Sequence, residues 1–286
     1  MNPHLAALVL RLQEQPSHTG SLIMTLMGDA IMPRGGTVAL STILDLCAGL
    51  DIGSGVVRTA VSRLAADGWL VASRQSRSSF YGIGPARRGE FVRAARHIFG
   101  PSRRPQVKQL SLILLEAGEA REPLRNRLTR LGFVAWQGVM IAPERPLPPS
   151  VAANVLAVTA TATDDTIMRL ATKAWRLEGL AALYTDFIES FGPIAEIAAA
   201  FTPRDAMLAR TLIIHDYRRI MLRDPRLPVA FLPSPWIGAG ARRLCAAIYA
   251  ALRPASERWL DTNAITQWGN LPPADSSLAH RFADLR

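Results

Sequence analysis

The sequence of 286 residues predicts a multidomain protein of the α+β class. Three observations predict it. A short amphipathic helix pattern is followed directly by two apolar runs between residues 53 and 84. Strand and helix patterns alternate over residues 110–158. From residue 166 onward, apolar residues recur mainly at helical spacing. We therefore divide the chain into three predicted domains, at residues 20–98, 105–165 and 166–286.

The helix pattern of the first domain covers residues 55–67. Ser54 is a suitable N-cap residue, and Gly68 supplies a permissive stop. An apolar stripe predicts the buried side: Val57, Ala60, Val61 and Leu64. The opposite face is basic and bears hydroxyl groups, which suits base edges and phosphates in a major groove, although solvated helix faces have similar compositions. The predicted DNA-binding residues of this helix are Ser54, Arg58, Thr59, Ser62 and Arg63.

The two apolar runs after this helix predict a β-hairpin. Residues 69–71 and 80–83 are the strands, and the polar residues 74–79 form the loop between them. A hairpin placed directly after a basic helix is the layout of a winged helix-turn-helix, in which the hairpin reaches the DNA backbone or minor groove. Its predicted DNA contacts are Arg74, Arg77 and Ser79. Two earlier helices and a breaker complete the domain, at residues 22–27, 41–47 and 33–36.

The rest of the chain predicts two further domains. A basic linking helix over residues 85–98 and a linker over residues 100–105 lead into a strand-helix-strand-helix-strand pattern typical of a ferredoxin-like α/β domain. Its clearest elements are strands at residues 110–115, 133–141 and 155–158 and a helix at residues 119–131. The C-terminal domain is predicted to be mainly helical, with helices at residues 167–176, 179–191, 194–201, 203–222 and 239–252 and an irregular end.

Charge favours a polyanionic partner. The formal net charge is +10, and only two of the 33 basic residues are lysines. Between residues 74 and 104 there are eight arginines and a single acid, Glu90, so positive charge adjoins the predicted hairpin. This is the electrostatic footprint expected of a DNA-binding domain, although an acidic ligand or membrane surface would also attract it.

Composition and cysteine usage predict a soluble, cytoplasmic protein. Hydrophobic residues make up 49% of the chain, yet no run approaches the ~18 apolar residues of a membrane span, so we expect no membrane partner. No signal peptide is apparent at the N-terminus. Cys47 and Cys245 lie in apolar helical segments without a CxxC pair, which predicts buried, reduced thiols.

Residue patterns for catalysis are weak. His215-Asp216 has the letters of a metal-binding HD pair, but no other histidine lies with carboxylates at ligand spacing. A GxSxG nucleophile elbow is missing from the sequence. We therefore expect no catalytic residue, no metal and no cofactor, and we interpret the chain as a non-enzyme.

Several segments resemble the PaaX-type repressors of phenylacetate catabolism, over about residues 21–271. The resemblance is carried by SLIMTLMGD with RGG, VRTAVSRLAADGWL with RQSRSSFYGIG, LGFVAWQGVMIAP, TLIIHDYRRIMLRDPRLP and ARRLCAAIY. The HDYRR and RDPRLP segments are the most specific. The family usually opens its middle domain with a WDGRW-like stretch, whereas this chain has RRPQVK at residues 103–108.

The resemblance implies a cytoplasmic repressor of an aromatic catabolic operon that an aryl-CoA thioester, typically phenylacetyl-CoA, releases from its operator. A two-fold operator predicts a homodimer. Aromatic rings and basic side chains of the C-terminal domain are candidate effector contacts, although such residues are more often core or solvated: Trp175, Tyr184, Arg210, His215, Arg218 and Arg219. The alternative is an acyl-CoA-binding or acyl-CoA-processing protein whose basic N-terminal domain binds ligand phosphates rather than DNA.

Overall fold

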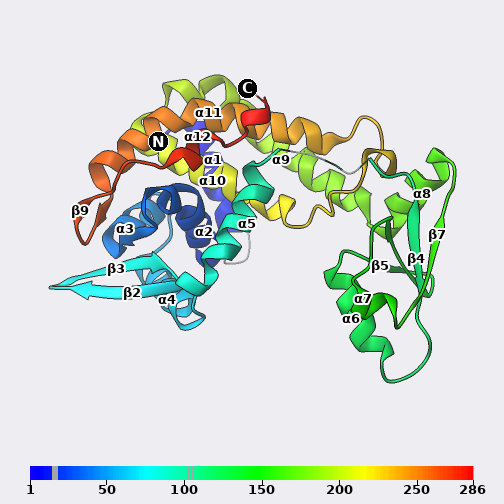
Figure 1. Cartoon of the computed structure of the whole chain (residues 1–286). Coiled ribbons are helices and arrows are strands. Elements are labelled where there is room, and N and C mark those ends of the chain that lie inside the picture. Colours follow the sequence, from blue (N-terminus) through cyan, green and yellow to red (C-terminus); the bar gives the residue numbers. More distant parts are fainter. Residues whose placement is uncertain (15–18, 102–103, 105, 286) are drawn as a thin grey trace. The chain divides into compact units, whose positions relative to one another are not determined.

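The computed structural model describes residues 1–14, 19–101, 104 and 106–285, and it is an α+β structure (Figure 1). Its residues form two compact units. The first comprises Met1–Pro101, Thr185–Leu222 and Ala239–Arg286, and the second comprises Ser102–Tyr184 and Arg223–Gly238. The first unit thus contains the predicted N-terminal domain together with much of the predicted C-terminal domain. The division into three domains stays a prediction.

The N-terminal part of the first unit is a set of helices followed by a hairpin. Its elements are α1 (Pro3–Glu14), α2 (Thr19–Leu26), the π-helical turn η1 (Met27–Ile31), η2 (Met32–Arg34), β1 (Thr37–Ala39), α3 (Leu40–Ala48), α4 (Ser54–Ala66), β2 (Leu70–Gln75), β3 (Ser78–Ile83), η3 (Pro85–Arg87) and α5 (Arg88–Phe99). Gly35 and Gly36 adopt positive φ angles of 87° and 79°, which confirms the predicted break after the first helical segment. The predicted linker at residues 100–105 lies partly outside the described residues.

A three-stranded antiparallel sheet has the strand order β1-β3-β2. The β2–β3 ladder runs from Leu70 opposite Ile83 to Gln75 opposite Ser78. Only two residues remain for the turn, and Ser76 adopts a positive φ of 54° there. The prediction of a six-residue polar loop was therefore wrong. The ladder continues through exposed polar residues, which carry no apolar alternation from which a strand could be read.

The C-terminal part of the first unit is mostly helical. It contains the end of α9 (Leu177–Ile197), η4 (Ala198–Ala200), α10 (Pro203–Met221), most of α11 (Ile237–Asn263), β8 (Ile265–Thr266), β9 (Gly269–Asn270), α12 (Ser276–Ala279) and η6 (Ala283–Leu285). Helix α10 is buried along most of its length, because it packs against α1, α2 and α5. The predicted helix ends at residues 191 and 252 were wrong, since Pro193 and Pro254 lie inside α9 and α11.

The second unit is built on a four-stranded antiparallel sheet with the order β5-β6-β4-β7. Its elements are β4 (Leu110–Leu114), α6 (Arg121–Arg130), β5 (Val134–Trp136), β6 (Val139–Pro143), α7 (Pro149–Ala152), β7 (Leu156–Ala160), α8 (Asp164–Ala174) and η5 (Val229–Phe231). Its core consists of Ile113, Leu128, Phe133, Met140, Ala142 and Val151. The single strand predicted at residues 133–141 is two strands, because Gln137 and Gly138 adopt positive φ angles and reverse the chain.

Both cysteines are free and buried, which confirms the prediction from their apolar surroundings. No helix among residues 1–14, 19–101 and 106–285 is long and apolar enough to span a membrane. Among these same residues, no group of three metal-ligating side chains is found.

Candidate nucleic-acid interface and effector-binding residues

Helix α4 is preceded by Gly53 and is followed by Gly68. The N-cap is Gly53, in an extended conformation, and it makes no side-chain cap. Ser54 is the first helical residue, so the prediction of Ser54 as N-cap was wrong. The Gly53 carbonyl accepts from the Val57 amide at 3.2 Å, and this is the first hydrogen bond of the helix. At the other end Gly68 has a φ of 72°, which confirms it as the stop.

The two faces of α4 separate as their residue types predict. Val57 and Val61 are fully buried and fix the helix to the body of the first unit. Ala60 and Leu64 are only partly buried, so the stripe is narrower than predicted. The residues of the opposite face are exposed: Arg58, Thr59, Ser62 and Arg63. The Thr59 hydroxyl donates to the Gly55 carbonyl at 3.0 Å, and such a bond leaves its second lone pair able to accept from a partner.

The β2–β3 hairpin carries its arginines toward the tip. Arg74 lies on β2 opposite Ser79 on β3, and Arg77 lies in the two-residue turn. Arg74 and Arg77 are exposed and Ser79 is partly buried. This places two cations at the far end of an extended arm, where they can meet phosphates without first being desolvated.

The angle between α4 and the hairpin is fixed by a close approach of backbone. The Gly84 amide donates to the Trp69 carbonyl at 2.9 Å, and a Cβ atom at Gly84 would come within 2.3 Å of the Gly68 carbonyl oxygen. A side chain is therefore excluded at Gly84. Trp69 packs edge-on against Phe91 of α5, with the Arg87 guanidinium 4.7 Å from its ring centroid. Helix α5 thus supports the base of the hairpin.

Two of the predicted effector residues lie in the second unit. Trp175 is half-buried and packs edge-on against Phe231, with ring centroids 6.4 Å apart. Tyr184 is almost fully buried, and its hydroxyl donates to Asp224 Oδ2 at 2.8 Å. Asp224 also accepts from Arg104 Nη2 at 3.1 Å. Tyr184 is therefore part of a packed polar cluster, while Trp175 keeps an exposed surface.

The other four predicted effector residues lie along α10 in the first unit. Arg210 is fully buried, and His215 is fully buried with its Nδ1 atom 3.2 Å from the Thr25 hydroxyl. Arg218 is partly buried and donates to the Ser21 hydroxyl at 3.1 Å, and burial lowers the pKa of its guanidinium. Arg219 is partly buried beside Asp216. The six predicted residues are thus divided between the two units.

A buried ionic cluster that the sequence did not predict surrounds Asp29 in η1. Its Oδ2 accepts from Arg210 Nε at 2.7 Å, and its Oδ1 accepts from Arg281 and from the Tyr249 hydroxyl, the latter at 3.0 Å. Arg210 also donates to Glu257 and to Ser256. In the sequence, only the position of Asp29 within the apolar run at residues 22–32 indicates a buried charge that needs a partner. We call these residues the Asp29 cluster: Asp29, Arg210, Arg281, Tyr249, Ser256 and Glu257.

Charge pairing decides the ionisation of this cluster. Burial acts to raise the pKa of Asp29, but the charges of Arg210 and Arg281 outweigh it, so the pKa lies below its ordinary value. For Arg210, burial acts to lower the pKa, and Asp29, Tyr249 and Glu257 together outweigh it, so the pKa is raised. Both groups are therefore charged at neutral pH, and the cluster holds η1 against α10 and α11.

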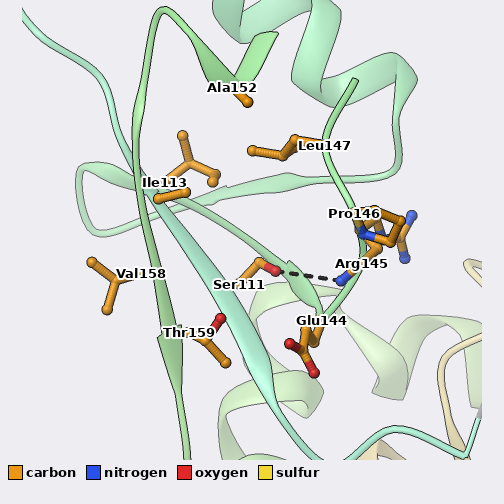
Figure 2. Close-up of a pocket in the computed structure, with 10 residues that line it drawn as sticks. Ser111, Ile113, Glu144, Arg145, Pro146, Leu147, Ala152, Val158 and Thr159 are labelled. Carbon is orange, nitrogen blue, oxygen red and sulfur yellow. Dashed lines mark hydrogen bonds between the residues drawn. The ribbon is translucent and has the colours of Figure 1, made fainter. Parts of the chain in front are cut away.

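The second unit contains a cavity of about 510 Å³ (Figure 2). It is lined mainly by apolar side chains, with Ser111, Thr159, Glu144 and Arg145 as polar members. The Arg145 amide donates to the Ser111 hydroxyl at 3.4 Å, and its guanidinium donates to the Leu131 carbonyl at 2.6 Å. Ala152 of α7, a helix of only four residues, also lines the cavity. The volume lies in the range of small-molecule sites, and no sequence signal predicted it.

The exposed basic face of α4 and the basic hairpin beside it define a surface suited to a polyanion. Comparisons with known proteins give the family. The family model described as PaaX-like protein matches residues 18–84, and PaaX-like protein C-terminal domain matches residues 175–262. A curated relative, Transcriptional repressor PaaX of Escherichia coli (strain K12), is 34% identical over 289 residues, covering 93% of this chain and 90% of that protein. The chain belongs to the PaaX-like family, which confirms the resemblance seen in the sequence.

The fold is also similar to that of a solved structure. Uncharacterized protein Rv0674 from Mycobacterium tuberculosis gives a TM-score of 0.54 at 22% sequence identity, covering 83% of this chain and 97% of that one. At this identity the likeness concerns the fold alone.

Proposed function

We propose that this chain is a DNA-binding transcriptional repressor of an aromatic, phenylacetate-like catabolic operon, and that it acts in the cytoplasm. One observation carries the proposal. The face of α4 with Arg58 and Arg63 is exposed, while Val57 and Val61 fix the helix beside a hairpin that ends in exposed arginines. A relative that is 34% identical and is named a transcriptional repressor supports it.

In this proposal residues 19–83 act as a winged helix-turn-helix. Helix α4 enters the major groove, where Arg58 or Arg63 bonds a guanine through both of its terminal nitrogens. The hydroxyl groups of the same helix bond phosphates and set the register: Ser54, Thr59 and Ser62. The β2–β3 hairpin lies along the backbone or minor groove, where Arg74, Arg77 and Ser79 bind.

We propose a homodimer on a two-fold operator, because a second recognition helix doubles the few bases that one helix can bind. The effector in this proposal is phenylacetyl-CoA or a related aryl-CoA. Of the six predicted effector residues, solvent reaches Trp175, Arg218 and Arg219, so these are the better candidates for direct binding. The second unit, proposed to be a ferredoxin-like domain, offers its cavity as a further candidate for the acyl group.

Release of DNA requires that the effector bind the DNA-incompetent arrangement more tightly than the competent one. Arg218 of α10 donates to Ser21 of α2, one of the helices that support α4. A phosphate that drew Arg218 away would remove this bond. Arg218 is therefore a direct physical link between ligand phosphates and the DNA-binding helices.

The experiment is a gel-shift titration on DNA from upstream of the protein's own gene, with and without phenylacetyl-CoA. The wild type should bind this DNA and release it when phenylacetyl-CoA is added. Arg58→Ala and Arg63→Ala should each weaken binding, by about 1–3 kcal/mol for whichever arginine bonds a guanine. Arg125→Ala, an exposed arginine of α6, is the matched control and should bind as the wild type does.

Two results would reject the proposal. Absence of any shift at moderate salt rejects DNA binding altogether. If instead the α4 variants lose affinity for phenylacetyl-CoA in calorimetry while DNA has no effect, the basic N-terminal segment binds ligand phosphates, and the chain is an acyl-CoA-binding or acyl-CoA-processing protein.

A further inference from the structure

The β8–β9 hairpin presents an exposed tryptophan. Trp268 lies in its turn and is 78% exposed, more than any other large hydrophobic residue in the described part of the chain. The turn itself is well bonded. The Trp268 amide donates to the Thr266 hydroxyl at 3.1 Å, that hydroxyl donates to the Gly269 carbonyl at 3.2 Å, and Gly269 adopts a φ of 114°. The backbone that carries the exposed ring is thus ordered.

Both ends of this hairpin are anchored to η2. The Arg34 guanidinium, which is almost fully buried, donates from Nη1 to Asp261 before the hairpin at 2.8 Å and to the Pro272 carbonyl after it at 3.2 Å. The Asp275 amide donates to the Pro33 carbonyl at 2.8 Å. A hairpin with only two residues in each strand would be unstable alone, so these bonds are what give it one position.

The same hairpin is joined to the β2–β3 hairpin. Strand β8 packs against β1 of the three-stranded sheet, and the Ser73 hydroxyl of β2 donates to Gln267 Oε1 at 2.9 Å. Ser73 is the neighbour of Arg74, and Gln267 is the neighbour of Trp268. The exposed indole therefore lies on a hairpin that directly adjoins the hairpin with the two arginines.

The charge of these two hairpins favours a polyanionic partner such as DNA. The sequence has no acidic residue from 68 to 89 or from 264 to 274, whereas the first of these segments contains four arginines. A phosphate backbone can approach such a surface without repulsion. A single exposed aromatic on a protein surface is ordinary, but this one is carried by an ordered turn next to the basic β2–β3 hairpin, and an ordered backbone lowers the entropy cost of binding.

We infer that Trp268 is a further DNA-binding residue, with its indole packed against a sugar or base at the groove that the neighbouring β2–β3 hairpin reaches. Flat apolar side chains bind nucleic acid in this way, by stacking or as a wedge between base steps. This inference rests on the proposed function, because it requires that the α4 surface binds DNA.

The test is fluorescence anisotropy of labelled upstream DNA with the full chain at several salt concentrations. Trp268→Ala should weaken binding roughly tenfold, as expected when one stacking aromatic ring is removed. The slope of log K against log salt should not change, because an uncharged side chain releases no counterions. Trp268→Phe should keep most of the affinity. Leu10→Ala, at a 64% exposed apolar residue of α1, is the matched control and should bind as the wild type does.

The outcomes separate this inference from the proposed function. Wild type that binds no DNA overturns both. Wild type that binds, with a Trp268→Ala variant of equal affinity and native circular dichroism, overturns only the role of Trp268. If Trp268→Ala lowers the mass of the DNA-free protein in analytical ultracentrifugation, Trp268 packs between subunits, and the inference is overturned in favour of that role.

Discussion

Replacement of Asp29 by asparagine removes the charge at the centre of the Asp29 cluster while keeping its shape. Asp29 is 3% exposed and accepts from two buried guanidinium groups, those of Arg210 and Arg281. Removing one partner of a buried ion pair typically costs about 3–5 kcal/mol, because charge is left uncompensated away from water. Arg210 retains the carboxylate of Glu257, which limits the loss. We expect Asp29→Asn to lower the free energy of unfolding by about 3 kcal/mol at pH 7.

The same substitution should change the dependence of stability on pH. The folded state holds the pKa of Asp29 below its ordinary value of 3.8. A carboxyl group with a lowered pKa stabilises the fold above its unfolded pKa, and this contribution is lost as pH falls through the folded pKa. The difference between wild type and Asp29→Asn should therefore be full at pH 7 and should shrink as pH falls below about 4.

Urea denaturation followed by circular dichroism measures both effects. Glu122→Gln is the control, since Glu122 makes an exposed pair with Arg125 at 3.0 Å, and an exposed pair contributes under about 1 kcal/mol. If Asp29→Asn unfolds within about 1 kcal/mol of the wild type at pH 7, or if the difference persists undiminished in acid, the buried charges do not stabilise this fold as we reason.

Two further predictions concern the hairpin and a buried thiol. The Arg74→Ala, Arg77→Ala double variant should bind operator and random DNA more weakly. The slope of log K against log salt should become shallower by about 0.9 for each phosphate that the hairpin no longer neutralises. An unchanged slope would show that the hairpin points away from DNA. Burial raises the pKa of the Cys47 thiol to about 12, so in the native protein it should resist a disulfide reagent at pH 8 and react once urea unfolds the chain. Rapid reaction of the native thiol would contradict its burial.

Local sequence determined the candidate DNA-binding surface to a large extent. The spacing of Val57 and Val61 identifies the buried side of α4, and the exposed positions of Arg58 and Arg63 follow from it. Gly68 marks the C-terminal end of α4, because glycine adopts a positive φ without steric strain. The same reasoning did not find the full length of β2. Most of this strand is exposed, so its sequence does not alternate between apolar and polar residues, and its extent depends on pairing with β3.

Tertiary structure alone decided what holds this surface in place. Asp29 pairs with Arg210 and Arg281, which are 181 and 252 positions away, and no local pattern indicates a pairing across such distances. A fragment ending near residue 100 would separate Asp29 from both partners. The position of the β8–β9 hairpin likewise depends on distant residues, because its strands of two residues are held by bonds from Arg34 and Ser73. The spacing of apolar residues predicts which side of a helix or strand is buried. Which distant segment packs against that side depends on the tertiary structure.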